Sequence, residues 1–317
     1  MIMYSEKIEL TYSHLDLGAL NEYGLMCLFG SMHSKALVYG LDLTVEDIKD
    51  HHGRRLYPAY FHTHLKVPKS LPLSRFGAWR HVQTAIDLKR FGKCYLDSSY
   101  VIKPGNHKAP EPIDFTSGIY PTMHGNNLFI VDVTEDSSVA RQLAVPESSL
   151  IASLDSVSEK PIAIQSAKEV SRNPIIKIKN YYRLISPESI AYKIVPERDV
   201  ALGHAMIFAR FCQVMDYAEF VFFDDQLEIP FGDHEFSEYS IVEREIFYFN
   251  NAYKGDTVDV GVKACVTSLG DGPDSQYFVE TEYQMFRRSN LDLLAVGYAK
   301  KQADRRLALG LLSKMPS

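Results

Sequence analysis

The second half of this 317-residue chain repeats the plan of the first half. Each half has a glycine-marked turn, then a long apolar helix, then strongly alternating strands. The turns contain Gly18 and Gly203, which are 203 − 18 = 185 positions apart. Arg55 and Arg244, which each open the strand after the helix, are 244 − 55 = 189 positions apart. Two near-equal offsets indicate an old duplication.

Hydrophobic periodicity predicts one buried helix in each copy, over residues 20–39 and 204–222. The expected strands cover residues 7–12, 55–67, 79–90, 93–103 and 128–133 in the first copy, and 190–195, 240–249, 257–268, 276–287 and 291–301 in the second. Residues 123–127 are expected to form a polar loop. A helix wrapped by an antiparallel sheet, twice in one chain, is the plan of a double hot dog, an α+β fold that mostly handles acyl thioesters.

This plan implies an N-terminal hot-dog domain over residues 1–150 and a C-terminal hot-dog domain over 181–317. The segment between them, 151–180, is rich in Ser, Lys and Glu and lacks a sustained period, so we expect an interdomain linker with at most a short helix.

Composition argues against several classes of protein, namely nucleic-acid-binding, disulfide-rich, zinc-binding, secreted and membrane-spanning proteins. A net charge of −6 and a pI near 6.0 argue against a nucleic-acid partner. The four cysteines lie far apart in sequence, which is typical of buried thiols and not of disulfide scaffolds or zinc sites. The first residues lack the pattern of a signal peptide, and no apolar run is long enough to span a membrane. We therefore expect a cytoplasmic protein without a metal or membrane partner, and the sequence is compatible with a homodimer.

A strand with an unusual density of aromatic and histidine side chains follows the first helix. Period two places Tyr60, His62 and His64 on one face of this strand and Tyr57 near the other. Pro58 restricts the strand to an edge or a bulge, and bulges often re-aim side chains near sites. The alternative is aromatic sheet packing with exposed histidines.

The start of the second helix offers a different kind of site. Asp199 and His204 flank it, and Gly203 would allow a ligand to approach closely. Unpaired N–H groups and the positive end of the helix dipole can polarise a thioester carbonyl or hold an oxyanion. Alternatively, Asp199 is only the N-terminal cap and His204 packs locally.

Three stretches taken together resemble a known family. They are Gly18-Ala19-Leu20-Asn21-Glu22-Tyr23 through Gly30-Ser31-Met32-His33, then Gly53-Arg54-Arg55-Leu56-Tyr57-Pro58-Ala59-Tyr60, and finally Arg244-Glu245-Ile246-Phe247-Tyr248-Phe249-Asn250-Asn251-Ala252 with Gly255-Asp256. In this order and spacing, over most of residues 10–300, they are similar to the family of the leinamycin-pathway bifunctional acyltransferase/decarboxylase and related polyketide biosynthetic proteins.

The resemblance implies an enzyme that moves a malonyl-type acyl group, such as that of methylmalonyl-CoA, onto a tyrosine oxygen. The enzyme then decarboxylates it and delivers the product to an acyl carrier protein. Phosphopantetheine would arrive with these substrates, and no cofactor of the protein's own is implied. The family's tyrosine falls on Tyr57, with Tyr60 as the other candidate. The acyl group itself does not carry over, because Asn250 replaces a usual glycine and Gly24 and Ser34 replace bulkier residues.

Such chemistry needs a general base or a cation beside the tyrosine, because a tyrosine with its ordinary pKa of about 10 is a poor nucleophile at neutral pH. His62, His64 and Arg55 are candidates for the base or cation, and His204 and Asn251 for stabilising an oxyanion or enolate. Arg55, His64, Asp199, Gly203 and Asn250 are the expected substrate-binding residues. The alternatives are a thioesterase or a dehydratase acting on carrier-bound acyl groups, and a non-catalytic acyl-binding homologue.

Overall fold

The computed structural model describes residues 4–11, 14–16, 19–77, 80–105, 114–115, 117–131, 142–177, 184–200, 205–226, 239–270 and 275–315. The chain divides into two compact units, Met1–Lys168 and Glu169–Ser317. The division falls inside α3 (Ile162–Arg172), within the segment expected to be a linker. Among the residues described, no helix has both the length and the apolar character needed to cross a membrane.

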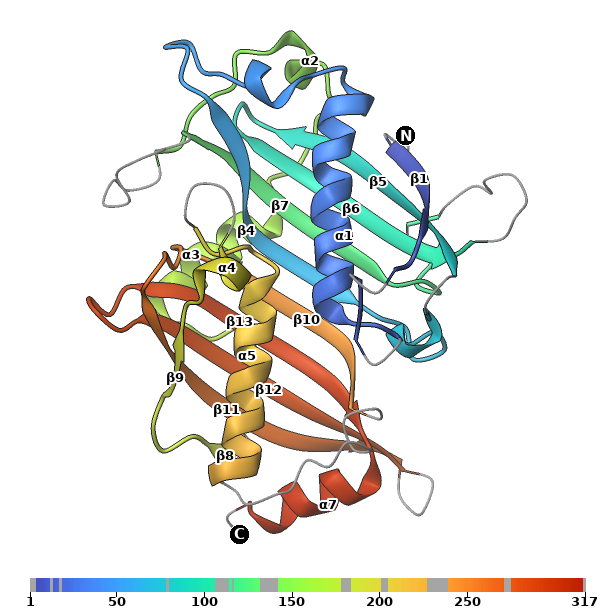
Figure 1. The fold of residues 1–317 in the computed structure, drawn as a ribbon, viewed down its shortest axis with the longest axis vertical. Coiled ribbons are helices and arrows are strands. Elements are labelled where there is room, and N and C mark those ends of the chain that lie inside the picture. Colours follow the sequence, from blue (N-terminus) through green and yellow to red (C-terminus); the bar gives the residue numbers. More distant parts are fainter. Residues whose placement is uncertain are drawn as a thin grey trace. The chain divides into compact units, whose positions relative to one another are not determined.

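Unit 1 is a central helix against an antiparallel sheet (Figure 1). The strands follow the order β1 (Tyr4–Glu9), β5 (His81–Phe91), β6 (Tyr95–Pro104), β7 (Thr122–Val131) and β4 (Leu56–Lys66). The smaller elements are β2 (Leu15–Asp16), β3 (Ala19–Leu20), the short helical turns η2 (Ala36–Gly40), η3 (Val45–Asp47) and η4 (Leu73–Arg75), and α2 (Ser149–Ala152).

The central helix of unit 1 is α1 (Glu22–Lys35). It begins where the Asn21 side chain accepts a hydrogen bond from the Gly24 N–H at 2.6 Å, which satisfies one of the unpaired groups of the first turn. Leu25, Phe29 and Met32 are fully buried, and the Phe29 ring lies 5.2 Å from that of Tyr100 on β6. The helix thus buries its apolar side against the sheet.

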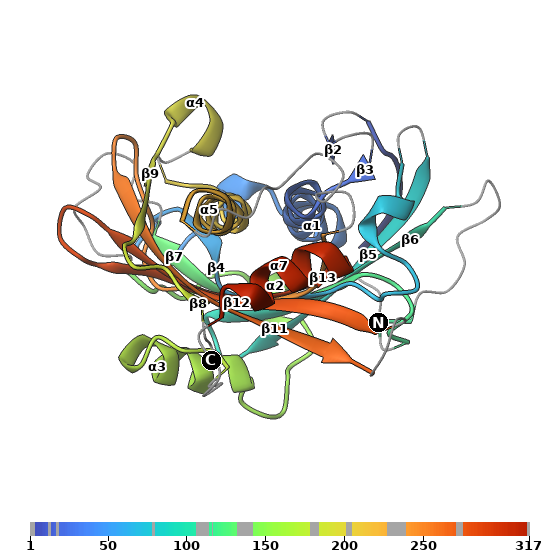
Figure 2. The same cartoon turned by 90° about the horizontal axis from the view of Figure 1, so that it is seen from below.

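Unit 2 has the same construction. Its strands follow the order β8 (Leu184–Ile185), β11 (Thr257–Leu269), β12 (Gln276–Arg287), β13 (Leu293–Ala303) and β10 (Ser240–Tyr248), and β9 (Ile190–Lys193) also pairs with β11. Its central helix is α5 (Arg210–Val221), continued by the helical turn η5 (Phe222–Gln226). The remaining helices are α4 (Pro196–Asp199) and α7 (Arg305–Ser313). Figure 2 shows each central helix cupped by the strands of its own unit.

The strand order confirms the predicted double hot dog. Unit 1 runs β5-β6-β7-β4 and unit 2 runs β11-β12-β13-β10, so in each unit the first long strand after the helix pairs with the last. The buried helix positions repeat as well, because Leu25 and Phe211 are 211 − 25 = 186 apart, and His33 and Glu219 are 219 − 33 = 186 apart. The two helices therefore present equivalent faces to their sheets.

Several local predictions are wrong. The expected loop at 123–127 is the first half of β7, whose polar side chains alternate between the two faces of the sheet. The second helix begins at Arg210, and not near residue 204. Arg244 does not open its strand but lies within β10, fully buried. The segment 151–180, by contrast, contains all of α3, the short helix that its interpretation as a linker allowed, and Ala163 and Ile164 of this helix pack on Phe61 of β4.

Candidate functional site

Five polar side chains lie between α1 and the sheet of unit 1, and we call them the inner cluster. One comes from the helix and four from three strands: His33 on α1, Tyr60 on β4, Ser98 and Tyr100 on β6, and Asn127 on β7. Four of them are at most 3% exposed. Polar groups are costly to bury without hydrogen bonds, so a cluster of this kind needs either internal pairing or a function.

Short hydrogen bonds join three members of the inner cluster in a relay. His33 Nδ1 lies 2.7 Å from the Tyr100 hydroxyl, which lies 2.7 Å from the Tyr60 hydroxyl. Ser98 Oγ is 3.5 Å from the same His33 nitrogen and donates to Asn127 Oδ1 at 3.3 Å. A proton leaving Tyr60 can therefore pass through Tyr100 to the imidazole.

Exposure differs along this relay. His33 is 3% exposed and Tyr100 is fully buried, whereas Tyr60 keeps part of its surface exposed. His33 Nε2 is buried and has no hydrogen-bond partner among the described residues. Tyr60 is thus the least buried member of the relay, although its hydroxyl lies in buried surroundings, and His33 forms the sealed end.

Burial sets the protonation states of the relay. It lowers the pKa of His33 to about 4, so the imidazole is neutral at neutral pH and can accept a proton. Burial also raises the pKa of Tyr60, although the hydrogen bond with Tyr100 and the nearby Asn127 side chain oppose the rise. Tyr60 is consequently a neutral phenol, and it can attack a carbonyl only if its proton moves into the relay at the same time.

The space for the two tyrosine rings depends on Gly125 of β7. A Cβ atom at this position would lie 2.8 Å from Tyr60 Cε1 and 3.3 Å from Tyr100 Cε2. Glycine in the interior of a strand often marks such a close approach. The lack of a side chain at Gly125 therefore leaves the space in which the two tyrosine rings meet.

The strand contains a bulge, one of the two outcomes predicted from Pro58, but the bulge lies at Phe61 and not at the proline, and it changes the expected faces. The β4–β7 register shifts between Tyr60 and His62. As a result, Tyr60 faces α1, whereas His62 bonds Asn126 on the opposite face of the sheet, and the His64 ring lies 6.4 Å from that of His62. The prediction that these three side chains share a face is wrong, because an inserted residue inverts the alternation.

The structure also separates the two candidate tyrosines. Between Leu56 and Tyr60 the strand is regular, so Tyr57, opposite Ile130, points away from α1. Arg55 is exposed just before β4. Neither belongs to the inner cluster, and of the residues predicted for the covalent step only Tyr60 does.

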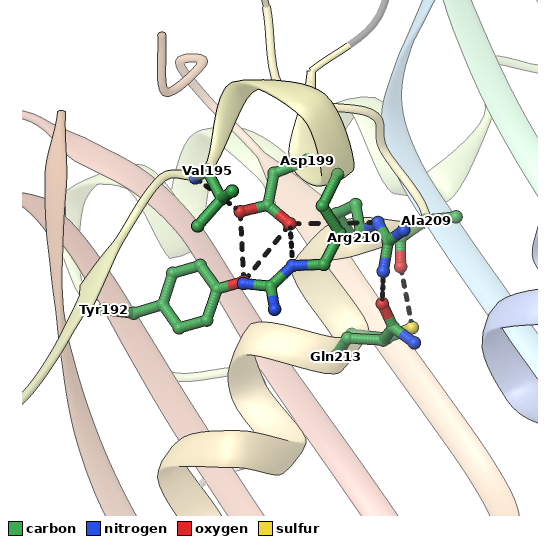
Figure 3. Close-up of polar contacts among 8 residues, drawn as sticks. Tyr192, Val195, Asp199, Ala209, Arg210 and Gln213 are labelled. Atoms are coloured by element: carbon green, nitrogen blue, oxygen red, sulfur yellow. Dashed lines mark hydrogen bonds and ion pairs between the residues drawn. The ribbon is translucent and has the colours of Figure 1, made fainter. Parts of the chain in front are cut away.

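In unit 2, the predicted residue Asp199 is fully buried at the end of α4 (Figure 3). Its carboxylate accepts hydrogen bonds from the Val195 N–H at 2.8 Å, from Arg198 Nε at 3.0 Å and from the Tyr192 hydroxyl at 3.0 Å. Arg210 Nε lies 3.9 Å away. These contacts tie α4 to the first residue of α5.

Asp199 is not the N-terminal cap of the central helix. The capping position of α5 is Ala209, whose side chain makes no capping hydrogen bond. The cap interpretation is therefore wrong, and the observed contacts give Asp199 the role of an anchor.

The remaining predicted residues stay predictions. Gly203 and His204 lie outside the described residues. Asn250 is exposed, and its amide donates to the Leu293 carbonyl at 3.1 Å. Asn251 is buried, and its backbone carbonyl accepts a 2.6 Å hydrogen bond from Arg287.

The helix position equivalent to His33 has different chemistry in unit 2. Glu219 occupies it and forms an ion pair with Lys301. Asp216 pairs with Lys301 at 2.8 Å and with the buried Arg244 at 2.6 Å. A neutral relay in one unit thus corresponds to a charged network in the other. Within the described ranges, no group of three or more His, Cys, Asp or Glu side chains is placed to hold a metal ion.

Sequence reasoning missed His33, Ser98, Tyr100 and Asn127. A usable signal existed for three of them, since His33 interrupts the apolar face of a buried helix and Ser98 and Tyr100 share a strand face with Leu96 and Ile102. Asn127 was hidden by the turn-like composition of its neighbours.

No family model matches the chain, and no curated protein is significantly similar to it in sequence. Solved structures do match over nearly the whole chain. A protein named as an oleoyl thioesterase from Lactobacillus plantarum has a TM-score of 0.60 and 12% identity, covering 95% of both chains. An acyl-ACP thioesterase from Bacteroides thetaiotaomicron has a TM-score of 0.56 and 9% identity, covering 94% of this chain and 97% of its own. The 12:0-ACP thioesterase from Umbellularia californica also has a TM-score of 0.56, with 10% identity over 95% of this chain and 94% of its own. At such low identity the likeness shows a shared fold, the double hot dog.

Proposed function

We propose that this protein is an enzyme that acts on acyl thioesters and that Tyr60 accepts the acyl group. The observation that carries the proposal is the relay in which the partly exposed Tyr60 connects through Tyr100 to a neutral, buried His33. The shared fold supports the substrate class, because the three solved structures compared above are named as thioesterases.

The proposed acyl transfer begins at the Tyr60 hydroxyl. The Tyr60 oxygen attacks the thioester carbonyl carbon, a C–O bond forms and the C–S bond breaks. The Tyr60 proton moves to the Tyr100 oxygen as Tyr100 passes its own proton to His33 Nδ1. Because burial disfavours the charged imidazolium, His33 readily returns the proton to Tyr100, and the Tyr100 hydroxyl protonates the departing thiolate, since acylated Tyr60 no longer carries a proton. The thiol of a carrier protein then attacks the tyrosyl ester: a C–S bond forms, the C–O bond to Tyr60 breaks, and the thiol proton passes to the Tyr60 oxygen.

Asn127 is the candidate for stabilising the oxyanion in this step. It lies directly opposite Tyr60 on the neighbouring strand, and its amide nitrogen is buried with no hydrogen-bond partner among the described residues. When Tyr60 attacks, negative charge develops on the former carbonyl oxygen, which is bonded to the carbon under attack. A hydrogen bond from the Asn127 amide to this oxygen would become stronger as the charge builds up.

The finer proposal rests on the family resemblance. The acyl group would be of the malonyl type, decarboxylated on the enzyme and delivered to an acyl carrier protein. Simple hydrolysis is the second candidate, and the thioesterase names of the structural neighbours favour it.

The test is incubation with methylmalonyl-CoA and a phosphopantetheinylated carrier protein, with intact-mass measurement of both proteins. We expect an acyl adduct on the enzyme and a propionyl group on the carrier. Tyr60→Phe should abolish both, and Tyr57→Phe, whose side chain lies on the other sheet face, serves as the matched control.

Other outcomes decide between the alternatives. Free acid with neither adduct nor loaded carrier indicates a hydrolase and overturns the tyrosyl mechanism. Loss of water from a β-hydroxyacyl carrier indicates a dehydratase. Reversible binding with no turnover across a panel of acyl-CoAs indicates an acyl-binding protein.

A further inference from the structure

The sheet face of unit 1 opposite α1 carries two adjacent rows of polar side chains, which we call the outer strip. Cross-strand pairing aligns Asp87, Ser99, His124 and His64 in one row, and Lys89, Asp97, Asn126 and His62 in the next. The flanking rows are apolar. Phe61, Phe91, Tyr95 and Leu128 pack with α3 on one side, and Ala85 and Val101 pack with Phe115 and Tyr120 on the other.

A continuous hydrogen-bonded chain runs through the outer strip. His62 Nδ1 lies 3.0 Å from Asn126 Oδ1, and Asn126 Nδ2 donates to Asp97 Oδ1 at 2.7 Å. The same carboxylate oxygen lies 2.9 Å from His124 Nε2. The other nitrogen of that ring, Nδ1, lies 3.4 Å from Ser99 Oγ. The imidazole of His124 is therefore held between a carboxylate and a hydroxyl.

Burial is greatest at the His62–Asn126 end of this chain and lowest at the His124–Ser99 end. His62 is 5% exposed and Asn126 is 1% exposed, so they fix Asp97 from the inside. The His124 side chain is 44% exposed, and Ser99 is half-buried. The end of the chain that meets solvent is thus the end with the hydroxyl and the base.

We propose that Ser99, His124 and Asp97 form a second acyl-accepting site, distinct from the inner cluster. Ser99 is the nucleophile, His124 the base, and Asp97 orients the imidazole and balances its charge after protonation. A nucleophile–base contact somewhat longer than an ideal hydrogen bond is common before substrate binds. The chemical class of substrate is an ester or thioester that can approach an open sheet face.

The proposed reaction is hydrolysis in two steps, acylation of Ser99 and deacylation by water. In the first, Ser99 Oγ attacks the carbonyl carbon while its proton moves to His124 Nδ1, and the leaving oxygen or sulfur takes that proton as its bond breaks. In the second, water attacks the acyl-serine with His124 as base, and a carboxylic acid and the free serine are released.

A fluorophosphonate probe tests the site directly, because it forms a P–O bond with an activated serine and expels fluoride. We expect peptide mapping to find the adduct on Ser99 in the wild type and not in Ser99→Ala. His124→Gln should slow labelling about 100-fold, the contribution typical of a positioned base. Ser153→Ala, which alters an exposed serine of the same unit, is the matched control and should label like the wild type.

Two further measurements separate this inference from the proposed function and from simple misfolding. Labelling of Ser99 should persist in Tyr60→Phe, whose altered side chain faces α1. In Ser99→Cys, iodoacetamide alkylation should titrate below the pKa of about 8.5 of a free thiol. Absence of the Ser99 adduct, an unchanged labelling rate in His124→Gln, or an ordinary thiol titration in Ser99→Cys would overturn the site.

Discussion

Gly125→Ala should disrupt the relay without removing any of its polar groups. The added methyl would lie 2.8 Å from Tyr60 Cε1, and a carbon–carbon contact ordinarily needs about 3.5 Å or more. The Tyr60 ring must therefore move by about 0.7 Å, which spoils its 2.7 Å hydrogen bond to Tyr100. Overpacking of this kind costs about 1–3 kcal/mol of stability. A misplacement approaching 1 Å costs about 100-fold in rate.

The assay is the rate of acyl-adduct formation measured by intact mass, together with denaturant unfolding of the same samples. Gly261→Ala is the matched control, because Gly261 is also a strand glycine but has nothing within 4 Å of the added Cβ. We expect the control to acylate at the wild-type rate. Gly125→Ala with unchanged rate and unchanged stability would refute the reasoning that the two tyrosines need this gap.

Three further predictions concern buried charge. Because the folded-state pKa of His33 is lowered from 6.5 to about 4, the unfolded chain binds its proton first. Stability should therefore fall by up to about 3 kcal/mol as the pH drops from 6.5 to 4, and His33→Gln should remove this component of a urea-unfolding series. Lys301→Met should cost about 3–5 kcal/mol because it leaves the buried Glu219 carboxylate unpaired. Lys301→Met combined with Glu219→Gln should recover most of that loss in thermal unfolding, and failure to recover would argue against the pairing. Asp199→Ala should cost about 1–3 kcal/mol in denaturant unfolding, since it leaves the Val195 N–H without its acceptor.

The fold was predictable because its signals are local and repeated. The boundaries expected for residues 276–287 agree with β12, where alternation is strong and turn residues flank the strand. The failure at 123–127 has a local cause, since His-Gly-Asn-Asn has the composition of a turn and its alternation is visible only once the neighbouring strands are known. Residues 205 and 206 form isolated bridges with Tyr253 and Val200, which explains why an apolar stretch does not begin the second helix.

The candidate site was less predictable because its contacts are long-range. His33 and Tyr100 are 67 positions apart, and no local pattern in the sequence joins them. The face of His62 was mispredicted because strict alternation allows no inserted residue, whereas the register shift after Tyr60 is set by pairing with β7. Sequence periodicity therefore identifies the strand that carries the chemistry, but not which of its side chains meet.

The bulge in β4 also bears on how related chains could diverge. On the N-terminal side of the bulge, Tyr60 lies on the sheet face toward α1. On its C-terminal side, His62 and His64 lie on the opposite face. Deleting Phe61 would remove the bulge and leave the downstream histidines on their present face, because His62 would then follow Tyr60 in regular alternation. Loss of the bulge with Phe61 retained would shift the pairing with β7 by one residue and turn His62 and His64 toward α1. Two related chains of equal length that differ only in whether this bulge forms could thus present different side chains to the central helix, and a comparison of residue identities alone would not reveal the exchange.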